Sequence, residues 1–311
     1  MPNILITNFC NRNCPYCFAK AQVKLGTTVS DWEMSEEEYD TVLSYLDPAR
    51  DIVSILGGEP TLHSSFGKYI DKVYKMGFKI KIFTNGATKN LREIAHLKDS
   101  ENLLIILNLN EPDTYNSSEW KEIETNFETF GDKIALSFNV YQPEFNWQFL
   151  KDAIIRFGLY TNIRLGVAQP IQVINNEYLR EKDLKRTMTR IVDMAQDMAP
   201  FGISLGFDCG FRMCDFTDEQ LGTLIQCGTV PMFKCGPNLD IGPNLDVWRC
   251  FPFSLEKGEK LTDYNSLSDL IDYFNNDWMK TKKIDNSKCN ACNNYSIDSC
   301  AGGCLSRKIV E

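Results

Sequence analysis

Three cysteines near the start of the chain have the spacing of a metal site. They are Cys10, Cys14 and Cys17, in the segment CNRNCPYC that directly follows a short apolar run. Three closely spaced thiolates can wrap one face of a cubane iron–sulfur cluster and leave its fourth iron open. An open coordination position is typical of a catalytic metal centre. Because the next cysteine is Cys209, a local four-thiolate site is disfavoured, and a structural zinc or plain buried thiols are the alternative.

Glycine-rich and polar segments stand where the following predicted strands end. The segment GGEP contains Gly57, Gly58, Glu59 and Pro60, the segment TNG contains Asn85, and Asn108 and Asn139 are single polar residues. Glycines allow a ligand to approach the backbone closely, and a carboxylate can pair with an ammonium group. Parallel α/β folds place their sites at the carboxyl ends of the strands, where all of these residues are expected. For the two single asparagines, the alternative is that they satisfy loop backbone.

In this order, CxxxCxxC, GGEP and TNG resemble the signature of the radical S-adenosylmethionine (SAM) superfamily. The resemblance covers residues 1–170 and implies a partial (β/α)6 TIM barrel. It implies a [4Fe–4S] cluster on the three cysteines, whose open iron binds SAM, and reductive cleavage of SAM to a 5′-deoxyadenosyl radical. It also implies that Tyr16 lies against the adenine and that GGEP binds the methionine amino group. Asn85, Asn108 and Asn139 belong to the same SAM site, the last two as ribose and carboxylate contacts.

Nine of the twelve cysteines lie in the last third of the chain. Apart from Cys227 they form three groups: Cys209 with Cys214; Cys235 with Cys250; and Cys289, Cys292, Cys300 and Cys304. The pattern is similar to the SPASM extension of radical SAM enzymes, or to the shorter twitch domain, and implies two auxiliary [4Fe–4S] clusters, or at least one. It departs from SPASM because Leu245 replaces a glycine, the middle spacing is seven residues, and no cysteine follows Cys304.

The last cysteine ligand of the SPASM pattern would have to be replaced, and Cys209 and Cys214 are the two candidates to supply it. Cys227 is the expected spare thiol because it lies on a helix-like stretch. A zinc ribbon made by the four C-terminal cysteines, or a single auxiliary cluster with several free thiols, are the alternatives. A Cys-rich segment with little periodicity cannot build a large apolar core, so we expect metal to hold it together.

The elements that position these residues alternate along the first 170 residues. Apolar runs predict strands at Ile4–Thr7, Ile52–Leu56, Lys79–Thr84, Leu103–Leu109, Ile134–Val140 and Asn162–Ala168. Amphipathic stretches predict helices at Glu36–Leu46, Phe66–Met76, Lys89–Leu97, Glu119–Phe130 and Trp147–Phe157, followed by a helix at Glu177–Met198 and a strand at Ile203–Phe207. The alternation predicts an α/β fold with a parallel sheet, either doubly wound or a partial barrel. We expect a core domain over residues 1–205 and a Cys-rich extension over 206–311.

Composition narrows the class of protein. A net charge of -9 over 311 residues argues against a nucleic-acid partner. No apolar run is long enough to cross a bilayer, and the N-terminus lacks the features of a secretory signal, so we expect a cytoplasmic protein without a membrane partner. Twelve cysteines in such a chain indicate metal rather than disulfides, and only two histidines, His63 and His96, disfavour mixed Cys/His zinc sites.

The leading functional expectation is an enzyme that abstracts hydrogen from a peptide or protein side chain, as in peptide maturation, oxidation or crosslinking. The alternative is a twitch-like dehydrogenase or mutase acting on a small molecule. A non-enzymatic iron–sulfur or zinc regulator would not need the GGEP and TNG register. A reductant such as flavodoxin or ferredoxin is the expected electron donor. Asp208, beside Cys209, is the candidate catalytic base, although an aspartate before a loop is commonly a cap.

Overall fold

The computed structural model describes residues 2–20, 32–171, 175–256 and 258–309. Seven strands from the first two thirds of the chain lie in sequence order in one sheet. They are β1 (Asn3–Thr7), β2 (Ile52–Gly57), β3 (Lys79–Thr84), β4 (Leu103–Asn108), β5 (Ile134–Val140), β6 (Tyr160–Val167) and β7 (Ser204–Phe207). Every neighbouring pair among them is parallel. Because the order never reverses, the sheet is an open partial barrel rather than a doubly wound sheet.

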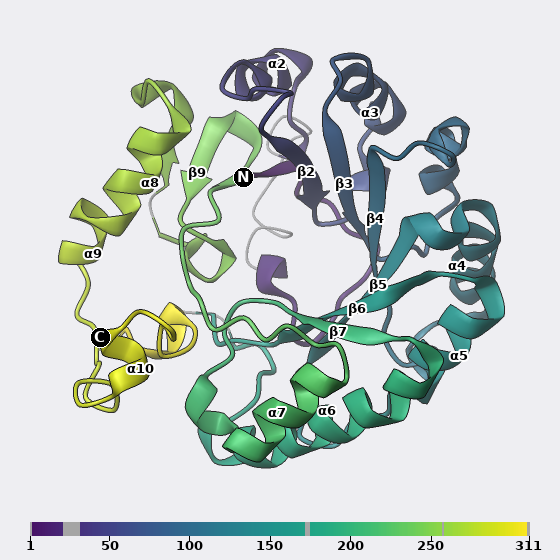
Figure 1. The fold of residues 1–311 in the computed structure, drawn as a ribbon. Coiled ribbons are helices and arrows are strands. Elements are labelled where there is room, and N and C mark those ends of the chain that lie inside the picture. Colours follow the sequence, from purple (N-terminus) through teal and green to yellow (C-terminus); the bar gives the residue numbers. More distant parts are fainter. Residues whose placement is uncertain (1, 21–31, 172–174, 257, 310–311) are drawn as a thin grey trace.

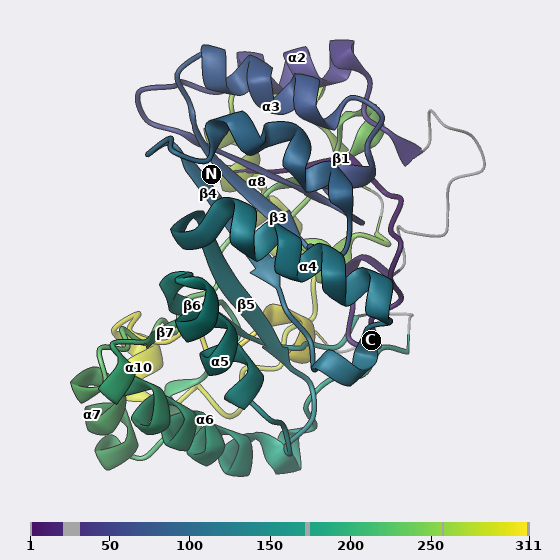
Figure 2. The same ribbon diagram turned by 90° about the vertical axis from the view of Figure 1, so that its right-hand side faces the viewer.

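Helices cover the outer side of this curved sheet (Figures 1 and 2). They are α2 (Glu36–Ser44), α3 (Phe66–Lys75), α4 (Ser117–Phe130), α5 (Gln148–Phe157), α6 (Leu184–Met198) and α7 (Asp218–Gln226). A capping box begins α2, since Ser35 and Glu38 exchange side-chain and backbone hydrogen bonds. Buried aliphatic and aromatic residues of these helices and of the strands form one hydrophobic core.

Two predicted helices differ from the structure. Residues Lys89–Leu97 form a 3-10 segment with a break at Ile94 rather than an α-helix. Its buried residues Leu91, Ile94 and Leu97 recur every three positions, which suits three residues per turn. The helix predicted to begin at Glu177 begins as α6 at Leu184 instead. The preceding residues bind elsewhere, because Glu177 N donates to Pro15 O and Leu179 O accepts from Arg307.

The last third of the chain continues the same sheet. Strand β8 (Asp240–Ile241) pairs in parallel with β1, and β9 (Asp246–Trp248) and β10 (Glu259–Lys260) follow it as antiparallel neighbours. Helices α8 (Leu267–Asn275), α9 (Asp277–Lys280) and α10 (Asn293–Ser296) stand on the side of the molecule away from α4 and α5 (Figure 1). A separate domain over 206–311 stays a prediction. None of the described helices is both long and apolar enough to span a bilayer.

Candidate functional site

The three N-terminal cysteines lie at the carboxyl end of the parallel strands and line one cavity of about 210 Å³. The structure brings them together with most of the other predicted SAM-site residues. The lining includes Cys10, Cys14, Cys17, Tyr16, Gly57, Gly58, Asn85, Asn108 and Asn139. Among the described residues no three His, Cys, Asp or Glu side chains are close enough to hold one metal ion. In a cubane cluster each thiolate binds a separate iron. The cysteines that hold a cluster therefore need to line one cavity, as these three do, rather than converge on a single point.

Burial governs the protonation of these thiols. It raises the pKa of Cys10 to about 11 and the pKa of Cys17 to about 12, and the negative charge of Cys14 adds to both effects. The Cys10 and Cys17 thiols are therefore neutral near neutral pH while no cation is near them. Binding of iron requires thiolates, so cluster assembly must release these protons. A compact set of soft sulfur ligands in a buried loop fits an iron–sulfur cluster.

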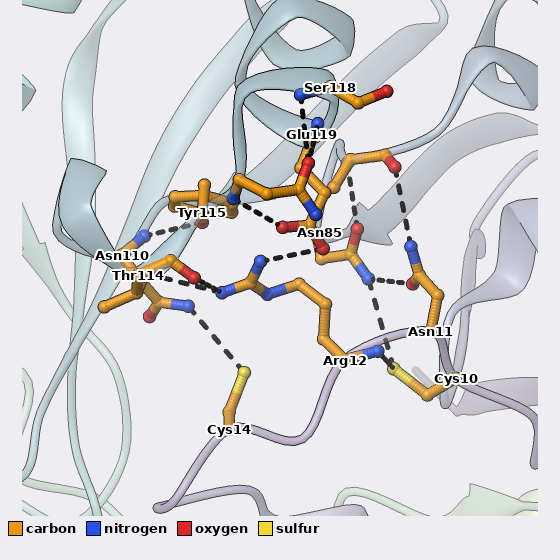
Figure 3. Close-up of polar contacts among 12 residues, drawn as sticks. Cys10, Asn11, Arg12, Cys14, Asn85, Asn110, Thr114, Tyr115, Ser118 and Glu119 are labelled. Carbon is orange, nitrogen blue, oxygen red and sulfur yellow. Dashed lines mark hydrogen bonds and ion pairs between the residues drawn. The ribbon is translucent and has the colours of Figure 1, made fainter.

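Amide groups at the ends of β3 and β4 point toward the cysteine sulfurs (Figure 3). Asn85 Nδ2 lies 4.0 Å from Cys10 Sγ, and Asn110 Nδ2 lies 3.7 Å from Cys14 Sγ. The backbone N–H of Arg12 also donates to Cys10 Sγ, at 3.4 Å. Donors of this kind stabilise negative charge on a thiolate and on the cluster that it would hold. Asn110 was not predicted from the sequence, where it is one more polar residue beyond β4.

The Arg12 side chain fastens the cysteine loop to the start of α4 (Figure 3). Its guanidinium lies 3.2 Å from a Glu119 carboxylate oxygen, donates to Thr114 O at 3.0 Å, and stacks over the Tyr115 ring at 3.9 Å. Asn116 caps α4 by accepting from the backbone N–H groups of Ser118 and Glu119. The loop that carries the thiols is therefore positioned by a rigid element, as a metal site requires.

A chain of hydrogen bonds links β5 to the cysteine loop. Asn139 Nδ2 donates to Asn108 Oδ1 at 2.7 Å, and Asn108 Nδ2 donates to the Tyr16 hydroxyl at 2.9 Å. The Tyr16 hydroxyl in turn donates to Asn110 Oδ1. The structure thus joins Tyr16, Asn108 and Asn139, as the predicted common site requires, and adds Asn110 as the link to Cys14.

Tyr16 also lines a second cavity, of about 370 Å³. The Tyr16 and Tyr141 rings lie 5.0 Å apart between their centroids, and both line this cavity. Arg12, Cys14, Tyr16 and Asn139 line both cavities, so the two are adjacent. An aromatic wall beside polar amides suits a purine ring with an attached ribose.

The two glycines of GGEP allow the first two site loops to meet. Gly58 N donates to Thr7 O and Glu59 N donates to Phe9 O, each at 2.8 Å. A Cβ at Gly57 would lie 2.2 Å from Thr7 O, and one at Gly58 would lie 2.3 Å from Phe9 O. Only glycine fits this approach. Pro60 is buried and begins a short 3-10 turn that ends the segment.

The Glu59 carboxylate is fully buried and is bound by protein donors. Its Oε1 accepts from the hydroxyls of Thr61 and Thr84, each at 2.7 Å, and its Oε2 accepts from Asn85 N at 2.7 Å. Burial raises the pKa of Glu59, and these hydrogen bonds oppose that rise. In the structure Glu59 joins the ends of β2 and β3. Its expected pairing with the amino group of SAM remains a prediction.

Asp208, the candidate base, forms an ion pair with Arg164 across the barrel wall. Arg164 Nη2 lies 2.5 Å from Asp208 Oδ2, and the side chains are about one-third exposed, at 34% and 28%. Arg164 lines the cavity that contains the three thiols. Lys81 is half-buried nearby, and both its burial and the charge of Arg164 lower its pKa. Asp208 therefore neutralises part of the cationic charge of Arg164 and Lys81, and its role as a base remains a prediction.

Eight cysteines of the last third fall into two groups. Cys209, Cys235, Cys250 and Cys304 lie close enough for charged thiolates to repel one another. Cys214, Cys289, Cys292 and Cys300 line a cavity of about 360 Å³. Cys227 instead ends α7, where its N–H donates to Thr223 O. Phe251, which follows Cys250, lines the cavity of the N-terminal thiols, so the first group adjoins the candidate SAM site.

The solved structures with a similar fold include peptide-bound proteins. The chain superposes on SuiB from Streptococcus suis bound to precursor peptide SuiA with a TM-score of 0.69, 17% identity, and coverage of 98% of this chain and 71% of that one. It superposes on anSMEcpe with bound AdoMet and Cp18Cys peptide with a TM-score of 0.64, 16% identity, and coverage of 98% and 90%. At these identities the likeness concerns the fold.

Two relatives with assigned activities match shorter segments. An S-adenosylmethionine-dependent nucleotide dehydratase from Selenomonas ruminantium is 34% identical over 85 residues, which are 27% of this chain and 29% of that protein. A 7,8-dihydro-6-hydroxymethylpterin dimethyltransferase from Methanocaldococcus jannaschii is 35% identical over 105 residues, which are 32% of this chain and 20% of that protein. The chain thus matches less than a third of the length of either relative.

A family model covers the part of the chain that carries the three thiols, the glycine turn and the strand-end amides. Residues 4–157 match the model of the radical SAM superfamily. The resemblance seen in the motifs is confirmed: this chain belongs to the radical SAM superfamily through the domain formed by these residues.

Proposed function

We propose that the protein is a radical SAM enzyme that abstracts hydrogen from a side chain of a peptide or protein, as in peptide maturation, oxidation or crosslinking. The observation that carries the proposal is the shared cavity of Cys10, Cys14 and Cys17 with the GGEP glycines and strand-end amides. When bound, a [4Fe–4S] cluster and SAM supply a 5′-deoxyadenosyl radical, the species that abstracts the hydrogen.

The protein side chains hold and shield this chemistry. Arg12 fixes the cysteine loop, and Asn85 and Asn110 direct N–H groups at two of its sulfurs. Tyr16 and Tyr141 form the aromatic wall of the adjoining cavity, where the adenine would lie. Burial of the Tyr16 side chain, which is only 5% exposed, helps to keep water away from a reactive radical.

The peptide class of substrate rests on the fold and on the open sheet. SuiB and anSMEcpe, which share the fold over 98% of this chain, have been crystallised with peptides. Terminal strands β7 and β10 flank the opening of the sheet, and backbone groups of such strands can pair with an extended peptide. Two auxiliary clusters on the eight C-terminal cysteines would carry electrons, and a flavodoxin or ferredoxin would reduce the SAM cluster. Asp208 is the residue proposed to accept a substrate proton.

The first prediction tests SAM cleavage. Anaerobically reconstituted and reduced protein should release 5′-deoxyadenosine, and Cys14→Ala should lower that rate at least 100-fold, about 2.7 kcal/mol, because two thiolates do not hold the cubane with one open iron. The Cys227→Ala variant is the matched control and should retain the rate. Release of 5′-deoxyadenosine by a variant with all three N-terminal cysteines changed to alanine would refute the function.

A small-molecule substrate is the second candidate. It is favoured by the cationic pair Lys81 and Arg164 in the barrel wall and by relatives named for a nucleotide and a pterin.

The second prediction distinguishes the two substrate classes. Adding a genomically adjacent small peptide should raise 5′-deoxyadenosine release above its uncoupled rate, and mass spectrometry should show the peptide changed by hydrogen loss or a crosslink. Stimulation by a metabolite, with no response to such a peptide, would support the small-molecule function instead.

A further inference from the structure

The loop that leaves β7 divides the C-terminal cysteines between two places. Cys209 lies at its start, near the charges of Cys235, Cys250 and Cys304. Cys214, five residues later, faces a separate cavity of about 360 Å³ together with Cys289, Cys292 and Cys300. Two neighbouring cysteines that looked like alternative replacements for one missing ligand therefore belong to two different sets of four thiols.

The first set is deeply placed beside the barrel. Cys304 is only 5% exposed, and Cys250 follows β9 and lies next to the cavity-lining Phe251. Polar groups already face two of its sulfurs: Ser306 Oγ lies 3.1 Å from Cys304 Sγ, and Arg249 Nη1 lies 4.0 Å from Cys235 Sγ. Four soft ligands with charge-stabilising neighbours suit an all-thiolate metal site.

The second set has a backbone shaped around sulfur. The Cys292 N–H donates to Cys289 O at 3.0 Å, which closes the CxxC turn, and the Gly302 N–H donates to Cys300 Sγ at 3.3 Å. Gly302 has φ +73°, and a Cβ there would lie 2.8 Å from Cys289 Sγ. The glycine thus leaves room for the Cys289 sulfur at the wall of the cavity.

Ion pairs bring Cys214 to this cavity. Arg212 binds both carboxylate oxygens of Asp215, at 2.7 and 2.8 Å, across a short 3-10 turn that contains Cys214. Arg212 Nη1 and Lys288 Nζ both donate to Glu181 Oε1, at 2.7 and 2.9 Å. Because Lys288 directly precedes Cys289, Glu181 holds the turn with Cys214 and the CxxC segment against the same point.

We propose that the two cysteines of the loop after β7 belong to different auxiliary iron–sulfur sites: Cys209 joins Cys235, Cys250 and Cys304 in an inner site, and Cys214 joins Cys289, Cys292 and Cys300 in an outer one. Cys214 supplies the fourth thiolate of the outer site, whose cavity it lines with the three other cysteines. The proposal deepens the proposed function by assigning the auxiliary ligands. With four thiolates each, neither cluster would have an open iron, so both would serve electron transfer rather than substrate binding.

The test counts iron in full-length protein whose SAM cluster has been removed by Cys10→Ala, Cys14→Ala and Cys17→Ala. At four irons per cubane, this background should hold about eight irons. Adding Cys209→Ala or Cys214→Ala should each leave about four irons, or leave one cluster with an altered Mössbauer signal, whereas adding both should affect both clusters. Cys227→Ala is the matched control and should keep about eight irons with unchanged signals.

Three results would overturn the assignment: unchanged iron and spectra in the Cys214→Ala variant, a double variant that loses no more iron than either single variant, or stoichiometric zinc in place of iron. Cys214→Ser, which offers a small oxygen ligand, should retain iron with a shifted signal and so separates ligand loss from misfolding. Because the SAM cluster is absent from this background, failure of the assignment is distinguishable from failure of the proposed function, which the release of 5′-deoxyadenosine by the wild type reports.

Discussion

At the residue scale, Asn110, which was not predicted from the sequence, connects several parts of the candidate site. Its Oδ1 accepts from Tyr16, its backbone N–H donates to the Tyr115 hydroxyl at 2.9 Å, and its Nδ2 points at Cys14 Sγ. A wall of the proposed adenine site and a proposed cluster ligand are thus held by one amide. Hydrogen bonds to cluster sulfurs are one of the factors that set reduction potential.

Asn110→Asp should therefore make the SAM cluster harder to reduce. The change keeps the acceptor for Tyr16 but replaces the donor to Cys14 with a carboxylate oxygen. Loss of a net contribution of about 1 kcal/mol corresponds to roughly 40 mV for a one-electron couple, toward more negative potential. The measurement is a potentiometric titration of the cluster whose paramagnetic signal changes when SAM is added. Asn276→Asp adds the same charge near the end of α8 and should leave the potential unchanged, and an unchanged or raised potential in Asn110→Asp would contradict the argument.

At the element scale, local patterns in the sequence predict the strands and the order of the motifs well, because alternation and strand-end chemistry depend on short segments. All seven predicted strands exist, and their ends bring the thiols, glycines and Asn85 into one cavity. Features that depend on distant contacts could not be predicted in this way. The late start of α6 follows from bonds to Pro15 and Arg307, and the division of Cys209 from Cys214 follows from the path of one loop.

The contact between the loops after β1 and β2 gives a prediction at this scale. Gly58→Ala places a Cβ against Phe9 O, a backbone atom that cannot move without displacing the cysteine loop. We expect the free energy of unfolding to fall by about 1–3 kcal/mol, and SAM to bind more weakly. Urea unfolding and calorimetric titration with SAM measure the two effects.

Gly222→Ala is the matched control for this change. Gly222 lies inside α7, and a Cβ there would meet nothing within 4 Å. Alanine is the better helix former, so this variant should gain roughly 0.5–1 kcal/mol in the free energy of unfolding and bind SAM normally. If Gly58→Ala and Gly222→Ala changed the free energy of unfolding equally, the contact of Gly58 with Phe9 O would not be tight.

At the scale of the whole molecule, the last third of the chain is attached to the barrel at two distant places. At one edge, β8 pairs with β1, and Asn3 Nδ2 donates to Asp240 Oδ1 at 2.6 Å. Beyond β6, Arg307 Nη2 donates to Leu179 O at 2.8 Å and its Nε donates to Gln169 Oε1. The segments that carry the C-terminal cysteines therefore bridge the opening of the partial barrel, which suits the proposed electron transfer to the candidate SAM site.

The first of these attachments should make stability depend on pH. Asp240 is only 1% exposed, and burial raises its pKa to about 7, from 3.8, although hydrogen bonds from Asn3 and from the Phe251 backbone oppose the rise. The folded state therefore holds a proton that the unfolded state releases. The contribution of this bound proton to the free energy of unfolding is complete below pH 3.8 and is lost as the pH rises through about 7, by up to about 4 kcal/mol.

Asp240→Asn, which mimics the protonated carboxyl, should remove this loss. Urea unfolding of the reduced, metal-free protein should show the variant more stable than the wild type at pH 8, with the difference shrinking toward pH 5. The exposed Asp132→Asn should show no such trend, and a difference between Asp240→Asn and the wild type that stays constant with pH would exclude titration of Asp240 as its source.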